Sequence, residues 1–322
     1  MNKSEIDPKI LEQIKKLEEK YQVMGQDLSS YLDGLLYSDY LTYWDYVHLD
    51  TLLSLQNPKT GFKDEMIFIT YHQHTELFFK LILWEIDQIA EKEKPEPKFV
   101  LERMKRINGY FKVLESSFSV MVDGMDKQQF LKFRMSLLPA SGFQSAQYRL
   151  IEISTTDILN LVDVDSRKEF NSKSSIEDQM EKIYWRSGAT ELASGKKTLT
   201  LKQFEDKYMG EFLARANSFK QTNLLKVYQN NFAELNDDAL INEYRIFDVY
   251  ANVKWRLAHY KSAVRYLQKD PEDIAATGGT NWQKYLPPRF QKIIFFPELW
   301  NEEEKSEWGK SWVLKEVFNH EQ

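Results

Sequence analysis

The sequence contains no cysteine among its 322 residues. This absence excludes disulfide bonds, thiolate nucleophiles, zinc sites with cysteine ligands, iron–sulfur clusters and thiolate-ligated iron. It also fits the reducing cytosol. The first twenty residues are charged throughout and lack a signal-peptide core, and no apolar run reaches the ~18 residues of a membrane span. We therefore expect a soluble, cytoplasmic protein with no membrane partner.

Long basic blocks are also missing, and the formal net charge is −6. The electrostatic footprint of a nucleic-acid binder is therefore absent, and we expect no nucleic-acid partner. The sequence has no HExxH motif and no Glu-x-x-His pair, which excludes the zinc-protease and di-iron bundle patterns. It has no G-x-S-x-G motif, so a serine hydrolase is not indicated either.

Aromatic residues, in contrast, are abundant. The chain has 8 Trp, 17 Tyr and 20 Phe, which together make 14% of its residues. This is more ring surface than a helical bundle needs for packing alone, and it suits a flat apolar ligand. Ordinary aromatic packing is the alternative interpretation, and composition does not decide between the two.

Apolar residues recur at helical spacing along most of the chain, which predicts an all-α fold. We expect one helical domain over residues 1–322, with an N-terminal interface segment over about residues 1–40 and a surface insertion over about residues 163–235. The apolar period weakens from Val162 to about Thr200, so we expect a surface excursion there that contributes no chemistry. The expected helices cover residues 8–23, 62–89, 99–122, 146–161, 204–235, 239–268 and 302–318.

Two histidines lie in the middle of strongly apolar predicted helices. His72 shares one face of the helix over residues 62–89 with Phe68 and Glu76, and this helix is apolar on both faces, so we expect it to be buried nearly all round. His259 lies in the helix over residues 239–268. Two such helices across a slot lined with rings could hold haem, with one imidazole on iron. Well-packed core histidines are the alternative.

One arginine stands in a similarly apolar setting. Arg134 occurs in the run FLKFRMSL, close to Phe130, Phe133 and Leu137. A guanidinium stays charged, so in an apolar environment it needs an anion, and its planar fork suits a carboxylate. An internal ion pair, or a surface arginine with a buried stem, would explain the pattern equally well.

Four blocks follow one another along the chain: TYWDYVHLDTLLSLQ, DEMIFITYHQHTELFFKLILWEI, FLKFRMSLLPASGFQSAQYRLIE, and WRLAH with ATGGT after it. In this order they resemble the tryptophan 2,3-dioxygenase family, and they span Thr42 to Thr280. The combination of SGFQSxQYR with FxxxHQxxEL is highly specific. The resemblance implies a helical bundle that encloses a pocket for haem b.

The resemblance also implies roles for residues at the centre of the pocket. It implies that His259 is the proximal ligand of the haem iron and that His72 is the distal histidine, facing the indole N–H of the substrate. Phe68, one turn before His72, would pack on the indole ring. Arg134 would clamp the substrate carboxylate.

Further roles follow from the same resemblance. Ser141 would line the pocket near the haem, and Thr277 in the TGG loop would meet the ammonium and carboxylate end of the substrate. Tyr43 and Tyr46 match an aromatic pair that family members lend to a neighbouring subunit's pocket. This implies a homotetramer whose sites are completed across an interface.

The resemblance therefore predicts that O2 and L-tryptophan are converted to N-formyl-L-kynurenine by cleavage of the indole C2–C3 bond, the first step of kynurenine-pathway catabolism. Two differences from the family pattern leave other functions open. Phe130 stands where many members have a tyrosine, and the loop between His259 and Thr277 is a few residues longer than in bacterial members. The alternatives are a haem-dependent monooxygenase of a substituted tryptophan and a non-catalytic helical protein that binds haem or tryptophan.

Overall fold

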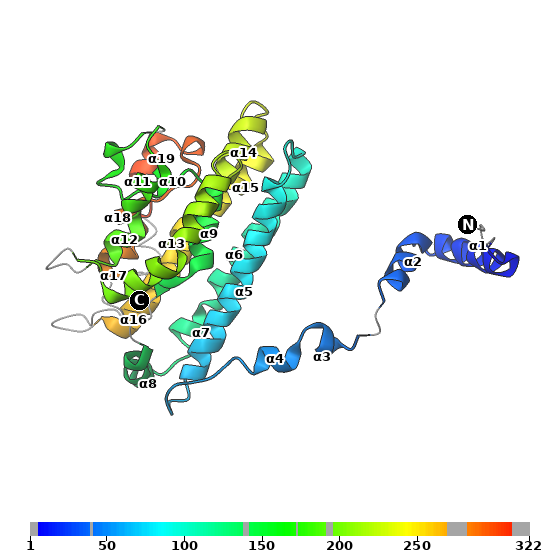
Figure 1. The fold of residues 1–322 in the computed structure, drawn as a ribbon, viewed down its shortest axis with the longest axis horizontal. Coiled ribbons are helices and arrows are strands. Elements are labelled where there is room, and N and C mark those ends of the chain that lie inside the picture. The colour runs from blue at the N-terminus through cyan, green and yellow to red at the C-terminus, as the bar shows by residue number, and fades with distance from the viewer. Residues whose placement is uncertain are drawn as a thin grey trace, which may run out of the picture. The chain divides into compact units, whose positions relative to one another are not determined.

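The computed structural model of the chain describes residues 6–38, 41–137, 142–171, 173–190, 196–268 and 282–310. Its regular elements are helices (Figure 1), which confirms the predicted all-α class. Within the described ranges, β pairing is confined to two isolated bridges, Val162 with Ile183 and Thr190 with Lys197. In the same ranges, no helix combines the length and the apolar character needed to cross a membrane.

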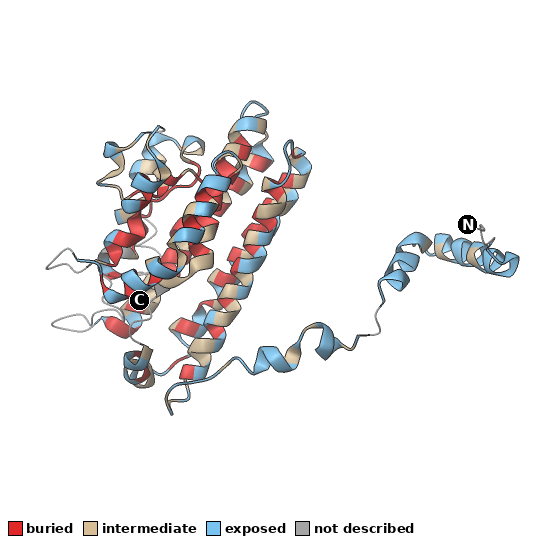
Figure 2. Cartoon of the chain, in the orientation of Figure 1, coloured by how far each residue is buried: buried red, intermediate tan, exposed pale blue. Residues whose placement is uncertain are grey.

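The chain divides into two compact units, Met1–Gln56 and Asn57–Gln322. Asp7 begins the first helix of the first unit as predicted, because its side chain accepts a hydrogen bond from the Lys9 N–H at 2.8 Å. None of the helices of this unit contains a buried residue (Figure 2). The helices are α1 (Pro8–Val23), α2 (Leu28–Leu36), α3 (Tyr43–Tyr46) and α4 (Leu49–Leu53).

The second unit holds the core and every cavity-lining residue discussed below. Its α-helices are α5 (Glu65–Ala90), α6 (Pro97–Ser117), α7 (Ser119–Val122), α8 (Lys127–Phe133), α9 (Ala146–Thr155), α10 (Ile158–Leu161), α11 (Ile176–Glu181), α12 (Tyr184–Gly188), α13 (Leu199–Ser218), α14 (Leu224–Asn231), α15 (Asp238–Val249), α16 (Trp255–Leu267), α17 (Trp282–Tyr285), α18 (Pro288–Gln291) and α19 (Glu302–Ser306). The other helices are η1 (Arg134–Leu137), η2 (Gly142–Gln144), η3 (Arg167–Glu169), η5 (Pro297–Leu299) and the π-helix η4 (Tyr250–Lys254).

The core forms around α6, which packs against both α5 and α15; α5 and α6 run side by side in Figure 1. Val100, Met104, Ile107 and Phe111 follow one another at helical spacing on α6, and all are completely buried. Burying each of these side chains stabilises the fold by roughly 1.5–3 kcal/mol. The predicted helix over residues 99–122 is confirmed, with a break between α6 and α7 at Phe118.

The expectation that the helix carrying His72 is buried nearly all round is wrong. One side of α5 is buried in the core through Phe79 and Ile82. The opposite side leaves Leu77, Leu81 and Trp84 exposed by 51%, 43% and 65%. Apolar residues on both faces indicate burial only if both faces have a neighbour, and among the described residues only one face of α5 is covered.

Three other predicted helices are divided in the structure. The helix over residues 204–235 consists of α13 and α14, with a break between Ser218 and Leu224. The helix over residues 146–161 breaks into α9 and α10 at Thr156, whose hydroxyl donates to the Phe295 carbonyl at 2.5 Å. The helix over residues 239–268 is continuous in direction but consists of α15, η4 and α16. α16 ends at Leu267, one residue before the predicted end.

Candidate functional site

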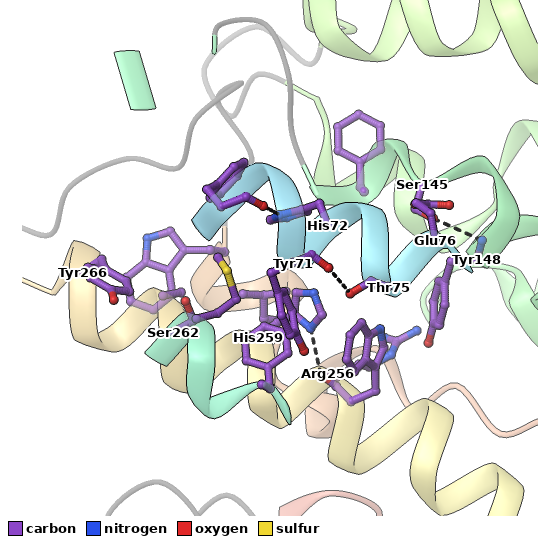
Figure 3. A pocket seen from close by; sticks show the side chains of 18 of the residues that line it. Tyr71, His72, Thr75, Glu76, Ser145, Tyr148, Arg256, His259, Ser262 and Tyr266 are labelled. Atoms are coloured by element: carbon purple, nitrogen blue, oxygen red, sulfur yellow. Dashed lines mark hydrogen bonds between the residues drawn. The ribbon is translucent and has the colours of Figure 1, made fainter. Parts of the chain in front are cut away.

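A cavity of about 390 Å3 lies in the second unit, within the size range of small-molecule sites (Figure 3). Side chains from α5, α7, α8, η1, α9, α12, α16 and α17 line it. Aromatic rings form much of this wall. Polar groups are fewer and include two histidines and three arginines, and these are the side chains that can direct chemistry or hold charge.

His72 borders the cavity from α5. Its Nδ1 lies 2.7 Å from the Phe68 carbonyl, one turn earlier, so in the neutral ring Nδ1–H donates and Nε2 carries the lone pair. The ring has accessible surface because it borders the cavity, yet the surrounding protein atoms desolvate it. This burial lowers the pKa of His72, against smaller upward effects of the Phe68 carbonyl and the Glu76 carboxylate. His72 is therefore a neutral hydrogen-bond acceptor at pH 7.

His259 borders the same cavity from α16 and repeats this local arrangement. Its Nδ1 lies 2.8 Å from the Trp255 carbonyl, which again leaves Nε2 with the lone pair. The rings of Phe118 and Trp255 pack on it at centroid distances of 4.6 and 4.5 Å. Burial lowers its pKa to about 4, assisted by His72 and two arginines. A neutral imidazole with a free Nε2 is the form that binds a metal.

Arg134 enters the cavity wall as the first residue of η1. It is 5% exposed and follows the fully buried Phe133. Burial lowers the pKa of its guanidinium, although the group remains charged at pH 7. A cation held at the border of an aromatic cavity is suited to receive the carboxylate of a ligand.

Phe130 lies one turn before Arg134 and also lines the cavity. Its ring packs against Tyr266 at 4.5 Å and lies 6.3 Å from Phe68. The hydroxyl of Tyr266 donates to the Val122 carbonyl at 3.1 Å and lies 3.2 Å from the Met125 carbonyl. Position 130 therefore contributes an apolar surface to the cavity, and the neighbouring tyrosine hydroxyl is already bound to the backbone.

A buried polar network beside the cavity was not predicted. Its centre is the Glu152 carboxylate, which is 1% exposed. Arg149 Nη1 donates to Glu152 Oε2 at 2.6 Å, and the Tyr184 hydroxyl donates to Oε1 at 2.5 Å. Arg256 Nη2 lies 3.6 Å from the same carboxylate. Two guanidiniums thus share one carboxylate, and this part of the wall carries a net positive charge.

The members of this network come from three places in the sequence. Arg149 ends the run SGFQSAQYR and Arg256 lies in WRLAH, so the motifs contained the signal although no role had been assigned to either residue. Tyr184 lies in the excursion over residues 162–200, which was expected to contribute no chemistry. The expectation that this segment lies on the surface is wrong at α12, because Tyr184 is 1% exposed and lines the cavity.

The structure brings Phe68, His72, Arg134 and His259 together around one cavity. Ser141 and Thr277 lie outside the described residues. Tyr43 and Tyr46 belong to the first unit, where they are exposed by 71% and 74%.

The sequence is also similar to known proteins. A family model described as Tryptophan 2,3-dioxygenase matches residues 34–186. A protein named tryptophan 2,3-dioxygenase from Bacillus thuringiensis subsp. konkukian (strain 97-27) is 28% identical over 275 residues, which cover 82% of this chain and 92% of the relative. The chain is therefore similar to the tryptophan 2,3-dioxygenase family. The family model's range contains Phe68, His72 and Arg134, whereas His259 follows it.

Other proteins named tryptophan 2,3-dioxygenase match over shorter stretches at higher identity. The protein of that name from Ruegeria sp. (strain TM1040) is 39% identical over 117 residues, 36% of this chain and 42% of the relative. The one from Xenopus tropicalis is 42% identical over 135 residues, 38% of this chain and 33% of the relative. The chain thus matches less than half the length of these two relatives.

Proposed function

We propose that the protein is a haem-dependent dioxygenase that cleaves the indole C2–C3 bond of L-tryptophan with O2 and forms N-formyl-L-kynurenine. One observation carries the proposal: His72, His259 and Arg134, from three different helices, border one aromatic cavity. Both imidazoles leave Nε2 as the acceptor nitrogen. Similarity to proteins named tryptophan 2,3-dioxygenase supports the choice of substrate.

The cavity wall fits haem b in three respects. His259 offers a neutral imidazole whose Nε2 carries the lone pair, and this residue would hold the haem iron. Phe118 and Trp255 supply flat apolar surface around that ring. Arg149 and Arg256 outnumber the carboxylate of Glu152, so their net positive charge suits the anionic propionates of haem. When bound, haem supplies the O2 binding and oxygen-transfer chemistry.

The remaining lining residues would orient the substrate. Arg134 would bind the carboxylate of L-tryptophan, and Phe68 would pack on the indole. His72 Nε2 would accept a hydrogen bond from the indole N–H, because its Nδ1 proton is directed at the Phe68 carbonyl. An indole N–H is a very weak acid, so His72 is an orienting acceptor rather than an obligatory base. Correct orientation accounts for much of the rate that a protein contributes to such a reaction.

The proposal includes four residues whose part rests on the family resemblance alone. Ser141 would line the pocket near the haem, and Thr277 would bind the ammonium and carboxylate end of the substrate. Tyr43 and Tyr46 would complete the pocket of a neighbouring subunit in a homotetramer. Their high exposure in the single chain is compatible with burial by a second copy.

The test uses protein purified with haem, reduced, and mixed with aerated L-tryptophan. We expect growth of the formylkynurenine absorption band and a product that contains both atoms of labelled O2. A product that contains one labelled atom would instead support the monooxygenase alternative. Haem binding without turnover of any indole amino acid would support a non-catalytic binding protein.

A further inference from the structure

The helix that carries His259 begins with a π-helix. η4 (Tyr250–Lys254) joins α15 to α16, and Trp255, Arg256 and His259 all follow it. A π turn contains about one residue more than an α turn, so everything after it is rotated by about 100° relative to an uninterrupted α-helix. The extra residue therefore decides which face of α16 meets the cavity. Without it, a neighbouring residue would occupy the place of His259.

A single buried carboxylate connects this π-helix to the C-terminal part of the chain. Asp248 is completely buried. It accepts hydrogen bonds from the Phe295 N–H at 2.8 Å and the Phe296 N–H at 3.1 Å. The indole N–H of Trp300 donates to it at 3.0 Å, and the side-chain amide of Asn252, within η4, donates at 2.8 Å. Three of these donors come from the segment 293–300, and the fourth comes from the π-helix itself.

An apolar cluster also packs the segment 293–300 against α16. Val253 of η4 and Leu257 of α16 pack with Ile294 and Trp308 in a small group separate from the main core. Leu257 is two residues before His259, about 200° around the helix, so the cluster lies on the side of α16 away from the histidine. The segment 293–300 therefore packs against the side of α16 that is opposite to the cavity.

We propose that Asp248 is a positioning residue for His259, because it holds the π-helix against the segment 293–300 and so sets the face of α16 that meets the cavity. Its functional consequence rests on the proposed role of His259 as haem ligand. Both carboxylate oxygens are needed, since four donors converge on them. An asparagine would offer one acceptor oxygen and would direct its own N–H groups at the remaining donors, which leaves buried polar groups unsatisfied.

The first test is hydrogen–deuterium exchange of the haem-free full chain, followed by mass spectrometry. In Asp248→Asn, amides of residues 249–260 should exchange about tenfold faster or more, while those of α6 keep their wild-type rates. The matched control is Glu85→Gln, because Glu85 is 3% exposed and is bound by Arg103 at 3.1 Å, but lies on α5. Its effect should be confined to α5 and α6. Unchanged exchange of residues 249–260 in Asp248→Asn would overturn the proposal.

Trp300→Phe provides a milder variant should Asp248→Asn fail to fold. It removes one donor and keeps an aromatic ring against Trp308, which lies 4.9 Å away. Exchange of residues 249–260 should rise in the same direction, by about two- to threefold. Wild-type exchange in this variant would count against the proposal.

The second test measures the iron–histidine stretching vibration in haem-loaded protein by resonance Raman spectroscopy. A shifted or split band in Asp248→Asn, with a wild-type band in Glu85→Gln, is the expected result. If Asp248→Asn exchanges faster but keeps the wild-type iron–histidine band, Asp248 stabilises the helix without positioning His259. That result would overturn the proposal. Failure of the proposed function is distinguishable, because wild-type protein would then bind no haem while the exchange result still stands.

Discussion

His72 and His259 are oriented by the same kind of hydrogen bond. Each ring donates its Nδ1 proton to the backbone carbonyl one turn earlier in its own helix, at 2.7 and 2.8 Å. The helix thus sets the tautomer without help from another element, and it leaves Nε2 available toward the cavity. The two rings differ in their neighbours, since His259 lies between Phe118 and Trp255, whereas His72 packs on Phe68.

We predict that His259→Ala abolishes stable haem binding, because the axial bond to iron is lost. The Soret absorbance per mole of purified protein measures this. His74→Ala is the matched control: His74 also lies on α5 in an aromatic environment, 4.7 Å from Phe78, but does not line the cavity. It should keep the wild-type Soret band. A full Soret band in His259→Ala would disprove the ligand assignment.

We predict that Arg134→Leu keeps haem but lowers kcat/KM for L-tryptophan by roughly 30- to 1,000-fold, equivalent to ~2–4 kcal/mol of lost interaction with a desolvated carboxylate. The kcat/KM of Arg134→Lys should lie between those of the wild type and Arg134→Leu, because lysine keeps the positive charge and lacks the planar guanidinium. Steady-state kinetics with L-tryptophan and with an analogue that lacks the carboxylate show whether the lost interaction is the one with the carboxylate. Preference for the carboxylate should disappear in Arg134→Leu; if it persists, Arg134 is not the clamp.

We predict that His72→Ala retains turnover, with kcat/KM reduced on the order of tenfold, because one neutral hydrogen bond to the indole N–H is removed. Substrate binding followed by absorbance, together with single-turnover rates, provides the measurement. Complete inactivity with unimpaired binding would contradict an orienting role and assign proton transfer to His72.

At the scale of single elements, the region 238–267 shows how a small insertion controls a site. The apolar pattern predicts one long helix there, and the helix direction is indeed continuous through α15, η4 and α16. The π turn leaves almost no trace in the pattern, because one extra residue shifts the apolar stripe without interrupting it. Its position becomes understandable only from the bonds that Asp248 makes with the segment 293–300.

The buried carboxylate of Asp248 makes stability depend on pH. Burial raises its pKa to about 6, and the hydrogen bonds from Phe295, Phe296, Asn252 and Trp300 offset this only in part. The pKa in the unfolded chain is about 4, so the folded protein binds more protons between these values. The stabilisation from this group is therefore fully present below pH about 4 and is lost as the pH rises through about 6.

Asp248→Asn does not titrate, so the comparison isolates this contribution. The free energy of unfolding of the wild type minus that of the variant should decrease by about 3 kcal/mol as the pH rises from about 4 to about 6 and should then level off. Urea unfolding of both proteins at several pH values measures it. The ion pair of Arg245 with Glu304 is present in both proteins, so its contribution cancels. A constant difference across this pH range would contradict the prediction.

On the largest scale, the described part of the first unit is unusual, because it has four helices and no buried residue in any of them. Its large apolar side chains are exposed, including Leu36, Tyr37 and Trp44 at 80%, 85% and 56%. Apolar surface of this extent is typical of a protein–protein contact. Together with the exposed side of α5 at Trp84, it favours burial by further copies of the chain, as the proposed homotetramer requires.

We predict that subunits defective in different parts of the site complement each other. Arg134→Leu subunits and Tyr43→Ser/Tyr46→Ser subunits should each be poorly active alone, and co-expressed mixtures should recover part of the wild-type activity, because some sites then combine an intact arginine with an intact tyrosine pair. Activity assays after analytical ultracentrifugation provide the measurement. A monomeric wild type, or mixtures no more active than their components, would refute shared sites.

Sequence alone was sufficient for the all-α class, the start of α1 and the helix over residues 99–122, because these depend on local capping and helical periodicity. The ordered motifs also placed His72, Arg134 and His259 in one family pattern. All three indeed border the same cavity.

The remaining features depend on contacts between segments that are distant along the chain. Arg149, Tyr184 and Arg256 share the Glu152 carboxylate although they are far apart along the chain, and periodicity does not encode such convergence. The face of α16 that carries His259 depends on bonds between Asp248 and residues about fifty positions later. Both features arise from packing between distant segments, where burial forces polar groups to find partners that no local pattern specifies.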